Sequence, residues 1–131
     1  MLRIPQSVYD SIVEHALADS PIEACGYLSG REGDAKTSYR LKNTDASGEH
    51  FSFDPEEQFA AFKDAMSLGL KLIACYHSHP QTPARPSAED IKLAYDPAIS
   101  YVIISLAEDV PVVKSFKIKN GDVSPEEIEV L

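Results

Sequence analysis

The sequence has little of the positive charge that nucleic-acid binding requires. Its 131 residues hold 12 Lys and Arg against 21 Asp and Glu, which gives a formal net charge of −9 at pH 7. Contacts with phosphates supply most of the affinity of nucleic-acid-binding proteins and leave a basic patch on them. The basic residues here are scattered, with one local cluster at Lys114, Lys117 and Lys119. We therefore expect no nucleic-acid partner, and the acidic balance fits solubility or a basic or neutral protein partner.

Cysteines and long apolar runs are also scarce. Cys25 and Cys75 form no C-x-x-C motif, and two unpaired thiols are typical of a reducing compartment, although a bridge between them stays open at this point. No apolar run approaches the roughly 20 residues of a membrane-spanning helix, and residues 1–20 lack the apolar core of a signal peptide. The prediction is a cytoplasmic protein with no membrane partner.

Several catalytic motifs are missing. The chain has no H-E-x-x-H, no G-x-S-x-G and no glycine-rich phosphate loop. It also lacks the paired H-x-E and P-C-x-x-C motifs of the zinc deaminases, which argues against deamination.

The apolar pattern predicts one domain over residues 1–131, of mixed α/β (α+β) class. Helices are expected in residues 5–21, from Asp54 to Gly69, and in a short segment after residue 86. Strands are expected at 23–33, 35–44, 70–77, 99–106 and 112–119, followed by an extended tail at 126–131.

Side-chain orientation follows from the same pattern. In the helix that begins at Asp54, the prediction places Phe59, Phe62, Ala65 and Met66 on the buried face. His15 and His50 have no spacing typical of metal ligands, and we predict that both lie on the surface.

The stretch YHSHPQTPARPSAED, residues 76–90, carries the chemistry. Alternate side chains of a strand share a face, so His77 and His79 point the same way. The prolines that follow stiffen a turn that can return the next helix, with Asp90 in its first turn, to the strand end. Two nitrogens and one oxygen leave a fourth position open for water, which is typical of catalytic zinc.

Such a site needs a base for the water and a donor for the developing oxyanion. Glu23, at the start of a strand, is the candidate base, although the residues alone leave other acids as alternatives. Ser87 offers a hydroxyl donor.

Taken together, His77-x-His79-Pro80, then Ser87-x-x-Asp90, with Glu23 upstream, resembles the JAMM motif of the MPN-domain (Mov34/PAD-1) metalloproteases. The stretches PIEACGYLSG and FSFDPEEQF are also similar to that family. The resemblance implies one Zn²⁺ per chain on His77, His79 and Asp90, with a catalytic water as the fourth ligand. It further implies Glu23 as general base, Ser87 at the oxyanion, and a cytidine-deaminase-like fold with a curved mixed β-sheet flanked by helices.

Ser87 and Asp90 also have simpler interpretations, and two neighbouring residues need an assignment. Ser87 also suits an N-cap, and Asp90 also suits a helix N-terminus through the dipole. Cys75 shares the face of the two histidines and could bind zinc, although the family pattern does not use it. Ser78 points the other way and is expected to support the strand end by hydrogen bonding.

The resemblance implies a zinc-dependent metallo(iso)peptidase. Its expected substrate is the amide bond after the C-terminal Gly-Gly of a ubiquitin-like or sulfur-carrier (β-grasp) protein. Two alternatives remain: a partner-gated or scaffold MPN module with little activity alone, and a zinc peptidase of small peptides.

Overall fold

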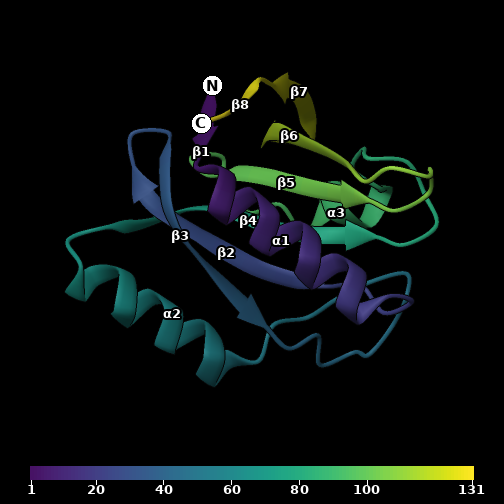
Figure 1. Cartoon of the computed structure of the whole chain (residues 1–131), viewed down its shortest axis with the longest axis horizontal. Helices are drawn as coiled ribbons and strands as arrows, with labels where there is room; N and C mark the ends of the chain where they lie inside the picture. Colours follow the sequence, from purple (N-terminus) through teal and green to yellow (C-terminus); the bar gives the residue numbers. More distant parts are fainter.

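The computed structural model describes residues 1–131 and centres on one eight-stranded mixed sheet (Figure 1). The strands are β1 (Leu2–Ile4), β2 (Cys25–Arg31), β3 (Asp34–Leu41), β4 (Lys71–His79), β5 (Ser100–Ser105), β6 (Val112–Lys119), β7 (Asp122–Glu126) and β8 (Ile128–Val130). Their order across the sheet is β7-β6-β5-β4-β2-β3-β1-β8. The predicted mixed sheet with flanking helices is therefore confirmed.

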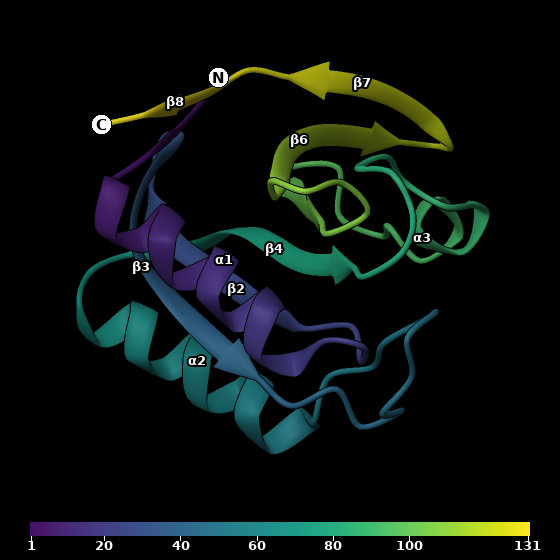
Figure 2. The same ribbon diagram turned by 45° about the vertical axis from the view of Figure 1, so that its right-hand side comes forward.

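The sheet is curved until its two edges almost meet. β7 and β8 are the outermost strands, yet only Glu127 separates them along the chain. Figure 2 shows β7 leading directly into β8 across the opening. β8 pairs in parallel with β1, and β4 pairs in parallel with β5, whereas β2 is antiparallel to both of its neighbours, β3 and β4. The expected tail is thus part of the sheet, and the sequence pattern revealed neither β1 nor β7.

Helices cover both faces of the sheet. α1 (Gln6–Asp19) packs with Tyr76 and Leu28 on one face. α2 (Pro55–Ser67) packs through Ala61 on the opposite face, with Tyr27 and Cys75. The short α3 (Ala88–Lys92) follows the turn after β4. Because side chains alternate along β4, Tyr76 belongs to the α1 layer while Cys75 and His77 belong to the α2 layer.

The predicted buried face of α2 is confirmed for Ala65 and wrong for the three larger side chains. Asp54 caps the helix as expected, its Oδ1 accepting from the Glu56 N–H at 3.0 Å. The buried side chains, however, are Ala61 and Ala65, whereas Phe59, Phe62 and Met66 are 60%, 48% and 60% exposed. The small alanine side chains let the helix approach the sheet closely. Because they occupy the face toward the sheet, the larger side chains of the helix point outward.

The prediction that His15 lies on the surface is also wrong. His15 is buried on α1, and burial lowers its pKa, so the ring is neutral near pH 7. Its Nε2 donates to Asp19 at 3.0 Å, and the Tyr76 hydroxyl donates to Nδ1 at 2.7 Å. Burial is tolerated because both ring nitrogens have partners. His50, in contrast, is exposed as predicted.

Two further expectations concern cysteines and membrane segments. Cys25 and Cys75 are both buried free thiols, so the possible bridge between them is absent. None of the helices combines the length and the apolar character needed to cross a bilayer.

Candidate metal centre

Three donor atoms converge at the end of β4. The Nε2 atoms of His77 and His79 lie 3.1 Å apart, and Oδ2 of Asp90 lies 3.1 Å from each of them. A tetrahedral ion with bonds of about 2.0–2.1 Å separates its ligands by about 3.3 Å, so this triangle fits such an ion closely. These residues are the group of metal-binding side chains that the structure brings together, and Cys75 is outside it.

Asp90 is fixed by the N-terminus of α3. Ser87 and Asp90 form a capping box, in which the Ser87 N–H donates to Oδ2 at 2.9 Å and the Asp90 N–H donates to the Ser87 Oγ at 3.0 Å. Burial alone would raise the pKa of Asp90, but the hydrogen bonds from His77 and His79 outweigh it and hold that pKa well below its usual range. The carboxylate therefore stays charged at neutral pH, as a metal ligand requires.

The turn after β4 orients His79. Its Nδ1–H donates to the carbonyl of Pro83 at 2.9 Å, so Nε2 is the ring nitrogen that faces the other two donor atoms and would bind a metal ion. The ring of His77 stacks on Phe51, with centroids 4.7 Å apart. Ser78 faces the other way and accepts from the Ala24 N–H at 2.8 Å, which confirms its expected supporting role.

Glu23 lies just before β2, the strand next to β4 in the sheet. Cys25 pairs with His77, and Ala24 bonds with Ser78, so the segment that carries Glu23 lies beside the end of β4, where His77 and His79 stand. Its side chain is buried at 4% exposure, and Oε1 has no hydrogen-bond partner. Burial raises the pKa of Glu23 to about 8, with His79 opposing the rise and Asp90 adding to it. Such a carboxyl can take up and release a proton near neutral pH.

Ser87 is exposed beside Asp90. Because its Oγ accepts the capping bond, its O–H remains available to donate to a substrate. Capping and donation are therefore compatible roles. For Cys75, burial raises the pKa of the thiol to about 12, which disfavours the thiolate that zinc binds.

An apolar cleft of about 1000 Å³ opens from the metal centre. His77 and Asp90 lie in its wall, and Phe62, Met66, Leu93 and Tyr95 line its outer part. All four of these outer side chains are among the exposed large hydrophobic residues. The cleft could not be seen in the helical pattern, which assigned Phe62 and Met66 to the core.

Comparison with known proteins identifies the family. The family model described as prokaryotic homologs of the JAB domain matches residues 5–119, and the chain belongs to this family. A CysO-cysteine peptidase of Mycobacterium tuberculosis is 32% identical over 134 residues, covering 100% of this chain and 92% of the relative. A desampylase of Haloferax volcanii is 34% identical over 112 residues, covering 79% of this chain and 80% of the relative.

A solved structure supports the fold. The solution structure of a Desulfitobacterium hafniense protein is similar, with a TM-score of 0.91 and 48% identity, covering 100% of this chain and 93% of that one. Its family and its peptidase relatives show that the chain is a hydrolase. Its His77, His79 and Asp90 form a group suited to a metal ion.

Proposed function

We propose that the protein is a zinc-dependent metallopeptidase that hydrolyses the amide bond after the C-terminal Gly-Gly of a ubiquitin-like or sulfur-carrier protein. The observation that carries this proposal is the 3.1 Å triangle of His77, His79 and Asp90 beside the buried carboxyl of Glu23. An imidazole and carboxylate donor set with an open position suits hydrolytic zinc.

In this proposal His77, His79 and Asp90 hold one Zn²⁺. When bound, zinc supplies a Lewis acid that polarises the scissile carbonyl and acidifies a water molecule. The chain itself contributes ligands that are ready to bind: a charged Asp90 and a His79 ring whose tautomer is set by Pro83.

The proton transfers are assigned to Glu23. Its carboxylate takes a proton from the attacking water and returns it to the leaving amine, and a buried carboxyl whose Oε1 has no other hydrogen-bond partner supports that role. The Ser87 hydroxyl donates to the carbonyl oxygen while negative charge develops on it, and its free O–H at the helix N-terminus supports that role.

The apolar cleft supports a protein substrate over a small peptide. It is large, and its outer rim carries exposed aromatic and aliphatic side chains that a short Gly-Gly peptide would leave uncovered. Glycine residues next to the scissile bond suit a confined site because they have no side chain to clash. The name of the mycobacterial relative supports release of a single amino acid as one form of the reaction.

The test is intact mass spectrometry of a β-grasp carrier with a short extension after its Gly-Gly. The carrier is incubated with zinc-loaded wild type, with Glu23→Gln, and with wild type plus chelator. The expected result is a mass loss that ends at Gly-Gly with untreated wild type alone, while Glu23→Gln keeps its zinc by elemental analysis.

Other outcomes favour the alternatives. Zinc-loaded wild type that cleaves no carrier would support a partner-gated or scaffold module. Equal cleavage of the carrier and a short Gly-Gly peptide would support a peptidase of small peptides. Loss of zinc from Glu23→Gln would refute the division between ligands and base.

A further inference from the structure

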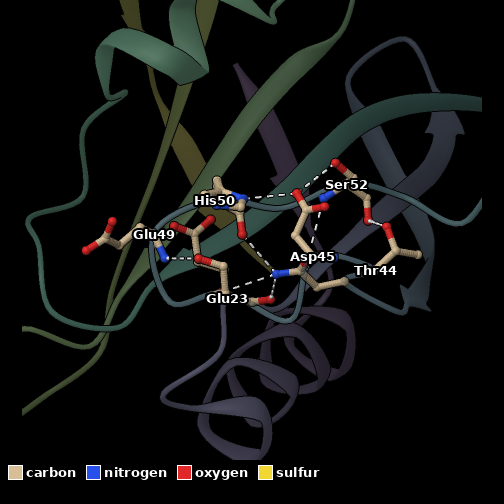
Figure 3. A network of polar contacts seen from close by, with 8 residues as sticks. Glu23, Thr44, Asp45, Glu49, His50 and Ser52 are labelled. Atoms are coloured by element: carbon tan, nitrogen blue, oxygen red, sulfur yellow. Dashed lines mark hydrogen bonds and ion pairs between the residues drawn. The ribbon is translucent and has the colours of Figure 1, made fainter.

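Asn43 is a buried polar residue in the loop that follows β3, and its side chain has five hydrogen-bond partners. Its Nδ2 donates to three backbone carbonyls, those of Glu23 at 3.1 Å, Ser47 at 3.3 Å and His50 at 3.0 Å. Its Oδ1 accepts from the N–H groups of Asp45 at 3.0 Å and Ser52 at 3.3 Å. Figure 3 shows how Glu23 and the loop residues His50, Asp45 and Ser52 gather around these contacts.

The backbone at Glu23 is held from two sides. From the loop, Asn43 bonds the Glu23 carbonyl, and the Ser47 carbonyl accepts from the Glu23 N–H at 2.8 Å. From β4, Ser78 bonds both backbone groups of Ala24, through its Oγ at 2.8 Å and its N–H at 2.9 Å. The peptide that carries Glu23 is therefore tied both to the loop and to the strand of His77 and His79.

The Glu23 side chain lacks a comparable anchor. No hydrogen bond holds Oε1, although the atom is buried. The position of the carboxylate therefore depends on where the backbone sets its Cα, and a displacement of about 1 Å at a reacting group can cost a hundredfold in rate.

We propose that Asn43 is a positioning residue that sets the Glu23 carboxylate against the metal centre. This inference rests on the proposed role of Glu23 as the base. An amide suits the position because its two N–H groups serve the three carbonyls, one N–H being shared between two of them, while its oxygen accepts from the two backbone N–H groups. An aspartate of the same shape would keep the acceptor half and direct an oxygen at the carbonyls.

The experiment compares Asn43→Asp and Asn43→Ser with Thr44→Val as the matched control. Thr44 is exposed, and its hydroxyl donates to the Ser52 carbonyl at 3.1 Å, so the control removes a bond of the same loop that does not reach Glu23. We expect the Asn43 variants to lower kcat between about ten- and a hundredfold, with KM and zinc content within about twofold of wild type. Thr44→Val should leave kcat unchanged.

A second measurement needs neither substrate nor metal. Hydrogen exchange of the Glu23 amide, followed by NMR in the metal-free protein, should be at least about tenfold faster in the Asn43 variants than in wild type or Thr44→Val, since the opening of this peptide becomes easier. Thermal unfolding identifies which Asn43 variant is folded, and either one suffices.

The outcomes separate this inference from the proposed function. A rise in KM with unchanged kcat would mean that Asn43 only orders the loop, and would overturn the proposal. Unchanged Glu23 exchange in a folded Asn43 variant would overturn it as well. If wild type cleaves no carrier, the proposed function fails by itself, and the exchange rates still decide whether Asn43 holds Glu23.

Discussion

Replacing Glu23 by Gln is expected to stabilise the metal-free protein at neutral pH while it abolishes catalysis. The buried Glu23 has a pKa of about 8 in the folded protein against 4.5 in the unfolded chain. At pH values between about 4.5 and about 8, Glu23 keeps its proton in the folded state but has released it in the unfolded chain. The free energy of unfolding therefore falls as the pH rises from about 4.5 to about 8, and a glutamine, which mimics the protonated acid, avoids that loss.

The magnitude follows from the size of the shift. Each pKa unit corresponds to about 1.4 kcal/mol. Ionisation of Glu23 in the unfolded chain therefore lowers the free energy of unfolding of wild type by about 1 kcal/mol at pH 5 and by about 3 kcal/mol at pH 7. The advantage of Glu23→Gln over wild type should thus grow by about 2–3 kcal/mol between these two pH values. The other titrating groups near the site, such as His79 and Asp90, are present in both proteins and largely cancel in the difference.

The assay is urea denaturation of wild type and Glu23→Gln in the presence of chelator, at pH 5, 6 and 7. The unfolding free energies of the two proteins are compared at each pH, and equal m-values confirm that both unfold from similar states. A difference that stays constant across the range, or that shrinks as the pH rises, would show that Glu23 is not a buried carboxyl with a raised pKa.

Five further substitutions, in three groups, test the ligands, the oxyanion donor and the cleft. His77→Ala and Asp90→Ala should each lose zinc and activity together, because each removes one of three ligands, as measured by elemental analysis and carrier cleavage. Ser87→Ala should lower kcat between about a hundred- and a thousandfold by removing an oxyanion donor, and should cost about 1 kcal/mol of stability by removing the cap of α3. Phe62→Ser and Met66→Ser should change the free energy of unfolding by less than about 0.5 kcal/mol, because both side chains are exposed, yet raise KM for an intact carrier.

Each of these predictions has an opposing outcome. Full zinc occupancy in either ligand variant would mean that the ligand set is wrong. A Ser87→Ala protein with normal kcat and lower stability would mean that Ser87 acts only as the N-cap of α3. For the cleft, a short Gly-Gly peptide is the control substrate: an equal rise in KM for both substrates would place the effect at the metal centre rather than at a protein-docking surface.

The convergence of the three candidate ligands was predictable because it is local. His77, His79 and Asp90 lie within 14 residues, on a strand, a proline-rich turn and the first turn of a helix. Strand alternation and N-cap chemistry depend on neighbours a few residues away, so the spacing alone brought the donors together. The Asp54 cap of α2 and the strands β2 to β6 were read from the sequence for the same reason.

The errors concern contacts between distant segments. The sequence showed an apolar row on α2 but not whether Phe62 or Ala61 meets the sheet, since both choices satisfy helical periodicity. His15 could be placed inside only once Tyr76, 61 positions away, supplied a partner. β1 has three residues, too few for a periodic signal, and becomes a strand because it pairs with β3 and β8.

The sequence by itself determined the group of candidate metal ligands, the class of the fold and the family, because these follow from residue types at short spacing. Tertiary structure decided what surrounds the ligands. Pairing between β2 and β4 brings the segment of Glu23 beside the two histidines, Asn43 bonds the Glu23 carbonyl from another loop, and the cleft forms where α2 turns its large side chains outward. These arrangements depend on which elements pack together, and burial and hydrogen bonding across the whole chain settle that choice.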